Sequence, residues 1–116
     1  VEVGYCQFDN MTEAMQGVIE SNAWYIHDNL FTTCTSCIDM PMRNSQIIGN
    51  SIGAFTAAGN SGGIDLAGGA GLNMVRGNWL SGTYSSAGGY TVANANDEWA
   101  GNYANIAGIL TLNDPA

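Results

Sequence analysis

Two aspartates occupy equivalent places in two similar short runs. Asp39 lies in Cys37-Ile-Asp-Met and Asp65 in Gly63-Ile-Asp-Leu, each between apolar neighbours that a β-strand would point to the opposite face. If the runs pair side by side, their backbones lie about 4.8 Å apart. Carboxyl groups about 5 Å apart suit a retaining glycoside hydrolase, and their like charge would raise the pKa of one of them. The competing interpretation is a solvated pair, or a calcium or water site. Glu20 is a further acid available to such a set.

The single histidine and one of the two arginines define a second candidate set. The pattern predicts that His27, Ile48, Arg76 and Ala100 form one outward stripe on adjacent strands. Such a stripe could contact a sugar or a partner chain. The alternative is a surface histidine without a role.

Two aromatic residues form a third candidate set. Trp79 and Tyr103 each follow an asparagine directly and are predicted to share one outward register, which Leu30 and Ser51 extend. This stripe predicts a platform on which sugar rings stack, or a surface that packs against a neighbouring subunit or a covering loop. An apolar outward stripe is otherwise hard to keep soluble.

Three cysteines are present, and an odd number cannot pair completely. Cys34 and Cys37 have the spacing of metal ligands or of a redox pair, but no second pair or histidine cluster accompanies them. A thioredoxin-like site would also need a βαβ pattern, which is absent. We therefore predict small buried core residues, with no metal site. The glycine-rich residues 59–63 lack the lysine of a phosphate-binding loop, so no cofactor is predicted either.

The strands that would position the three candidate sets belong to a sequence repeat. A unit with apolar ends and a central asparagine recurs at residues 26–31, 47–52, 75–80 and 99–104, and residues 3–8 fit if Cys6 takes the asparagine place. The column positions are Cys6, Asn29, Asn50, Asn78 and Asn102, with spacings of 23, 21, 28 and 24 residues. Stacked coils would let these side chains bond along the axis as a structural ladder, and asparagine tolerates the left-handed backbone of a sharp corner.

A second apolar unit separates these copies, at residues 17–20, 37–40, 63–66, 89–92 and 108–111. The pattern predicts parallel strands at residues 3–7, 25–27, 46–48 and 74–76, and corner loops at residues 57–62 and 81–88. Residues 11–21 have some helical character and form a short helix or an irregular loop. The fold expected is all-β, a right-handed parallel β-helix of about five coils.

The domain organisation follows from the repeat. Coils are expected over residues 1–104, and the tail, residues 105–116, is expected to cap the C-terminal end. The N-terminal end has no cap in the sequence, which predicts upstream coils or a partner chain there.

These units resemble the parallel β-helix repeats of the pectin-lyase-like superfamily, and within it the β-helices of phage tailspikes, tail fibres and other virion proteins. Members of that superfamily include lyases, hydrolases and structural solenoids, and some hydrolases use outward aspartates on a sheet face. No family catalytic motif is matched, so no catalytic residue is carried over to this chain.

Charge and hydropathy exclude several classes. The net charge is −8 with two basic residues, which disfavours nucleic acid and anionic membranes. No apolar run reaches the roughly 18 residues of a membrane span, so no membrane insertion is expected. We expect a virion or extracellular module, a homotrimer or part of a larger virion assembly, that binds host surface glycans or neighbouring virion proteins. A secreted polysaccharide-degrading enzyme of pectin-lyase type and a bacterial surface adhesin are the alternatives, and the chain alone is expected to cleave no glycan.

Overall fold

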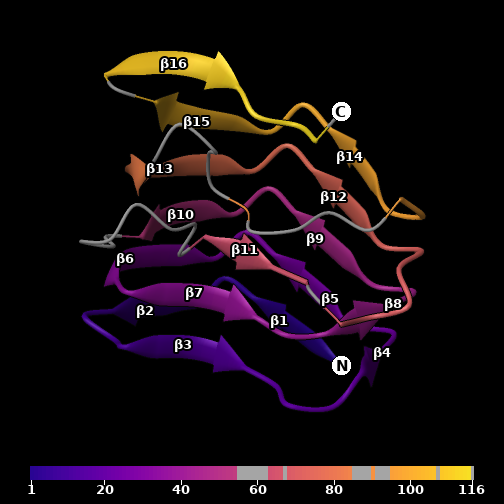
Figure 1. The fold of residues 1–116 in the computed structure, drawn as a ribbon. Coiled ribbons are helices and arrows are strands. Elements are labelled where there is room, and N and C mark those ends of the chain that lie inside the picture. The colour runs from indigo at the N-terminus through magenta and orange to yellow at the C-terminus, as the bar shows by residue number, and fades with distance from the viewer. Residues whose placement is uncertain (55–62, 67, 85–89, 91–94, 107, 116) are drawn as a thin grey trace.

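The computed structural model describes residues 1–54, 63–66, 68–84, 90, 95–106 and 108–115. The regular elements among these residues are all β-strands, and they stack as a parallel solenoid (Figure 1). The predicted all-β parallel β-helix is confirmed. Five passes of the chain through the two largest sheets make about four complete turns.

The two largest sheets lie side by side and follow each other in every coil. Sheet A is parallel and contains, in spatial order, β1 (Glu2–Gly4), β5 (Tyr25–His27), β9 (Gln46–Ile48), β12 (Met74–Arg76) and β14 (Glu98–Ala100). Sheet B contains β2 (Gln7–Asp9), β6 (Leu30–Cys34), β10 (Ser51–Ala54), β13 (Trp79–Tyr84), β15 (Tyr103–Ile106) and β16 (Ile109–Leu112). Only the last pair of sheet B, β15 with β16, runs antiparallel.

Two smaller sheets close the coils. Sheet C contains β3 (Glu13–Gln16), β7 (Ser36–Asp39) and β11 (Ile64–Asp65), and sheet D contains β4 (Ser21–Asn22) and β8 (Met42–Arg43). Isolated bridges extend both sheets by one coil, from Ile64 to Tyr90 and from Arg43 to Gly71. The unit predicted at residues 89–92 therefore meets sheet C at Tyr90, and its remaining residues lie outside the described part of the chain.

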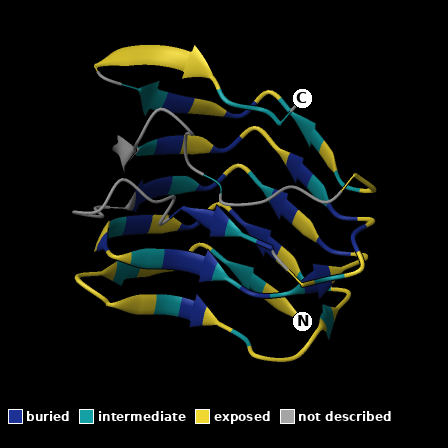
Figure 2. Cartoon of the chain, in the orientation of Figure 1, coloured by how far each residue is buried: buried dark blue, intermediate teal, exposed yellow. Residues whose placement is uncertain are grey.

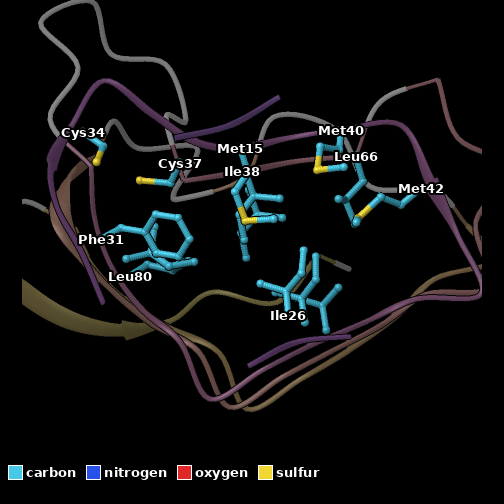
Figure 3. Close-up of a cluster of buried hydrophobic side chains, with 14 of the residues drawn as sticks. Met15, Ile26, Phe31, Cys34, Cys37, Ile38, Met40, Met42, Leu66 and Leu80 are labelled. Atoms are coloured by element: carbon cyan, nitrogen blue, oxygen red, sulfur yellow. The ribbon is translucent and has the colours of Figure 1, made fainter. Parts of the chain in front are cut away.

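The core is made of columns of like residues inside the coils. In sheet A, Ile26, Ile47 and Val75 occupy one register and are fully buried. In sheet B, the rings of Phe8 and Phe31 stack with centroids 4.7 Å apart. In Figure 3 the side chains of Ile26 and Phe31 face those of Met15 and Ile38 from sheet C in the interior. Each buried side chain of this size contributes about 1.5–3 kcal/mol, which no single coil could gain alone.

The corner between sheets A and B depends on a left-handed residue in every coil. The residue directly before each column position has a positive φ, between 51° and 68°; these residues are Tyr5, Asp28, Gly49, Gly77 and Gly101. The sequence predicted this left-handed conformation at the asparagines themselves, and that prediction is wrong. Turning the backbone one residue earlier leaves each asparagine side chain free to point into the stack.

Several predicted boundaries are corrected. The strand expected at residues 3–7 ends at Gly4, and Gln7 already belongs to sheet B. Residues 11–21 contain no helix; they contain β3, whose Met15 pairs with Ile38, and the first residue of β4. The unit aligned at residues 17–20 is therefore not a strand but the connection between β3 and β4. Residues 108–111 were expected to continue the parallel repeat, but β16 turns back antiparallel on β15. Residues 81–84 lie in β13 rather than in a loop, whereas residues 85–88 and 57–62 lie outside the described residues.

Burial follows the coil geometry. Buried residues form continuous stripes along the stack, and exposed residues gather at turns and on the end strand β16 (Figure 2). The predicted C-terminal tail thus covers the hydrogen-bonding edge of sheet B, while Ile109, Leu110 and Leu112 remain exposed. Because the described residues contain no helix, none of them forms a helix that could cross a membrane.

Candidate functional site

The asparagine column lies at the corner between sheets A and B and is structural. The Oδ1 atom of Asn50 accepts hydrogen bonds from the backbone N–H and the side-chain amide of Asn29, both at 3.0 Å. The same pattern links Asn50 to Asn78 and Asn78 to Asn102. Each amide also donates to a sheet A carbonyl of the preceding coil, so that Asn50 reaches Ile26. These side chains are fully used by the stack and have no free group for a ligand.

The column begins and ends with different residue types. Cys6 joins only through its backbone N–H, which donates to Asn29, while its thiol is exposed and contacts the carbonyl of Gly4. At the other end, Oδ1 of Asp114 accepts both donors of Asn102, at 3.0 and 2.7 Å. A carboxylate only accepts hydrogen bonds, so it ends the column without needing a further partner above it.

A second polar column lies at the corner that precedes sheet A, and sequence reasoning missed it. Ser45 Oγ accepts from the backbone of Trp24, Asn73 Oδ1 accepts from Ser45, and Asp97 Oδ1 accepts from Asn73. The left-handed turn recurs here, at Ala23, Asn44 and Leu72. A small polar residue directly before three sheet A strands, β9, β12 and β14, was the available signal.

The aromatic pair lines the groove that the structure shows on the outer face of sheet B. Trp79 and Tyr103 are register partners on β13 and β15, and they are 41% and 44% exposed. They lie in one outward column with Leu30 and Ser51, which is the predicted stripe. The groove has a volume of ≈ 340 Å³ and is lined by Gly77, Asn78, Trp79, Gly101, Tyr103 and Leu110.

The floor of this groove depends on two corner glycines. A Cβ added at Gly77 or Gly101 would meet no atom within 4 Å, so both positions face open space. In the first two coils the equivalent left-handed corners carry the side chains of Tyr5 and Asp28. The backbone conformation therefore does not demand glycine at this corner. In the last two coils, the absence of a side chain at Gly77 and Gly101 leaves the groove beside Trp79 and Tyr103 unfilled.

The two aspartates are adjacent, as their sequence runs imply, but they lie away from the groove. Asp39 on β7 and Asp65 on β11 are register partners and are half-buried on sheet C. Burial, followed by repulsion from Asp65 and Glu13, raises the pKa of Asp39 above its usual 3.8. Glu20, the further acid that the sequence offered, has other partners. It binds Arg43 and accepts a hydrogen bond from the backbone N–H of Ala70.

The predicted stripe of His27, Ile48, Arg76 and Ala100 is in register on sheet A. Its two basic residues, however, are engaged in separate ion pairs. Arg76 binds Glu98 through two nitrogens, one contact being 2.8 Å from Nε to Oε2. His27 contacts Glu2 and Asp28 and is only 5% exposed, so it is covered by neighbouring side chains rather than open on the surface.

The cysteine pair lies in the core. Cys34 and Cys37 are buried free thiols whose side chains point into the interior in Figure 3. Burial, with a smaller effect of Cys34, raises the pKa of the Cys37 thiol, so the reactive thiolate is disfavoured. Within the described residues no group of three or more His, Cys, Asp or Glu side chains could hold a metal ion.

No family model, no curated protein and no solved structure matches this chain.

Proposed function

We propose that this chain is a β-solenoid module of a virion or extracellular protein that binds surface glycans at the Trp79–Tyr103 groove. The observation that carries the proposal is two half-exposed aromatic side chains in register beside a groove of ≈ 340 Å³. Adjacent strands lie about 4.8 Å apart, so the two rings form a surface comparable in size to one pyranose. The apolar C–H face of a sugar would pack on this surface.

The chemistry of the lining favours a neutral sugar. Among the described residues that line the groove none is acidic or basic, and the chain carries a net charge of −8. An acidic glycan would gain no counter-charge in the groove and would be repelled by the rest of the surface. The resemblance of the repeat to virion β-helices supports the proposed location and the display role. A bacterial surface adhesin would use the same groove in the same way.

A second candidate is packing of the same face against another subunit in a homotrimer or a virion assembly. The observation that favours it is the continuation of the apolar stripe onto the exposed Leu110 and Leu112 of β16. Exposed apolar stripes of this kind mark interaction surfaces. Sedimentation of the chain over a range of concentrations distinguishes the two: a trimer that dissociates on Leu112→Glu favours packing, and a monomer favours glycan binding.

The enzyme alternative receives less support from the geometry. A polysaccharide hydrolase needs its acids beside the bound sugar, whereas Asp39 and Asp65 are on sheet C and the groove is on sheet B. Reducing-end assays on neutral and acidic polysaccharides test this, and we expect no cleavage. Cleavage that disappears in both Asp39→Asn and Asp65→Asn would put the enzyme first.

The glycan proposal is tested by an array screen followed by titration calorimetry with the best ligand. Trp79→Ala and Tyr103→Ala are expected to weaken binding about tenfold or more, corresponding to about 1.4 kcal/mol. Leu30→Ala is the matched control, because it lies in the same column with similar exposure but outside the groove. Absence of any bound glycan, or equal loss with Leu30→Ala, would contradict the proposal.

A further inference from the structure

The imidazole of His27 lies between two carboxylates on the outer face of sheet A. Its Nε2 atom is 2.7 Å from Oε1 of Glu2 on β1, and its Nδ1 atom is 2.9 Å from Oδ2 of Asp28. Glu2 and His27 are on neighbouring strands, 25 residues apart in sequence. The imidazole thus links β1 to β5, the first two strands of sheet A, through side chains.

The packing around the ring fixes its orientation. The ring stacks on Tyr25 with centroids 4.1 Å apart, and it meets Tyr5 edge-on at 5.3 Å. It also covers Gly4, where an added Cβ would lie 2.5 Å from its Cε1 and Nε2 atoms. Glycine at position 4 therefore leaves the space in which the ring can reach Glu2.

The two contacts require a charged ring. A carboxylate oxygen only accepts hydrogen bonds, and a neutral imidazole has one N–H donor. Both ring nitrogens of His27 can therefore donate only when the ring is an imidazolium. Its hydrogen bonds to Asp28 and then to Glu2 raise the pKa of His27 above its usual 6.5.

We propose that His27, Glu2 and Asp28 form a protonation-dependent clasp that fastens the first coil of the solenoid to the second. When the ring loses its proton, one nitrogen presents a lone pair to a carboxylate, and two negative charges remain without their counter-charge. Glu2 has a 68% exposed side chain and can move into water. β1 then keeps its backbone hydrogen bonds to β5 but loses this side-chain link.

Among the described residues that pack against the ring, no other positive charge could compensate the two carboxylates if the ring lost its proton. Tyr25 of β5 and Tyr5 of the corner supply aromatic faces, and the register neighbour on β9 is the uncharged Ile48. Arg76 lies one strand further along the sheet and is bound to Glu98. The clasp is therefore expected to respond to the titration of His27 itself.

The sign of the effect follows from the raised pKa. The clasp is fully closed below the unfolded-state value of 6.5 and opens as the pH rises through the higher folded-state value. The first coil is therefore held more firmly under mildly acidic than under mildly alkaline conditions.

The test is hydrogen exchange by mass spectrometry at pH 6.0 and pH 8.5, corrected for the intrinsic pH dependence of exchange. Peptides from residues 1–10 are expected to lose protection several-fold at the higher pH, while peptides from residues 74–80 are expected to change little. In His27→Gln, which cannot titrate, the difference is expected to vanish. That variant keeps every other ionisable group of the chain, so a pH effect that arises elsewhere would remain in it.

Two carboxylate variants complete the design. Glu2→Gln removes one partner at an exposed position and is expected to reduce the pH effect without unfolding the chain. Glu98→Gln is its matched control, since Glu98 starts the last strand of sheet A as Glu2 starts the first. An equal pH effect in the wild type and His27→Gln, or the same loss in Glu98→Gln as in Glu2→Gln, would overturn the clasp.

Discussion

The side-chain oxygen of Asn78 accepts both the backbone N–H of Asn50, at 2.9 Å, and its side-chain amide, at 3.0 Å. One atom of one coil therefore satisfies two donors of the coil before it. Both residues are only 1% exposed, so removal of the oxygen would leave the backbone N–H of Asn50 without a partner and its side-chain amide with the carbonyl of Ile26 alone. The stacking of coils at this corner is thus a matter of hydrogen-bond satisfaction as well as of apolar burial.

The first prediction concerns this column. Asn50→Leu removes the acceptor for both donors of Asn29 and the donor to the carbonyl of Ile26. We expect the free energy of unfolding to fall by about 2–4 kcal/mol, since an unsatisfied buried group costs about 1–3 kcal/mol. Chemical denaturation measures this. Asn22→Ala is the control, because Asn22 also bonds another asparagine side chain but is exposed; a cost equal to that of Asn50→Leu would contradict the role of burial.

The second prediction concerns the end of the column. Asp114→Ala removes the acceptors for Asn102 and for the backbone N–H of Gly101, which Oδ2 accepts at 2.9 Å. We expect a loss of about 1–3 kcal/mol in thermal or chemical unfolding. Asp114→Asn keeps the oxygen for Asn102 but turns an N–H toward that of Gly101, so an intermediate loss is expected. Equal stability of all three proteins would show that the tail does not cap the column.

The third prediction concerns the paired carboxylates. The raised pKa of Asp39 means that its ionisation disfavours the folded state. Stability is therefore lost as the pH rises from the unfolded-state value of 3.8 through the folded-state pKa. Asp39→Asn is expected to be more stable than wild type at pH 7, by at most about 1 kcal/mol given the partial exposure, and this advantage is expected to disappear near pH 3. Urea titrations at the two pH values test this, and an advantage that persists at pH 3 would contradict it.

The fourth prediction concerns the groove. Gly77→Asn adds a side chain that tolerates a φ of 62° and meets no atom within 4 Å at its Cβ. We expect stability to change by less than about 0.5 kcal/mol and glycan affinity to fall. Gly49→Asn provides the comparison, since Gly49 is the equivalent corner outside the groove lining. Unchanged affinity in Gly77→Asn would place the ligand elsewhere.

The sequence predicted the structure correctly where one residue type occupies the same position in successive coils. Asn29, Asn50 and Asn78 recur with apolar flanks, and a buried amide at a corner needs a partner, so the column was predictable. The register of Trp79 and Tyr103 followed from the same spacing. The second column was missed because Ser45, Asn73 and Asp97 perform one acceptor role with three side chains.

Local sequence patterns gave wrong predictions where contacts between distant residues determine the structure. Residues 13–16 and 17–20 both contain apolar side chains, but only Met15 packs on Ile38, while Val18 and Ile19 remain exposed. The contact of His27 with Glu2 was also not visible in the sequence, because Glu2 precedes it by a full coil. The antiparallel reversal of β16 on β15 was missed too, because no local pattern shows it.

The whole fold depends on successive coils that pair in parallel and in register. Nuclear Overhauser contacts between backbone protons of Ile26, Ile47 and Val75 test it most directly, because these residues are consecutive partners in sheet A. Parallel pairing in register predicts contacts from the α-proton of one strand to amide protons of the next, in the same order along each strand. Close contacts between α-protons of facing residues, which antiparallel strands give, or no contacts among the three residues, would contradict it.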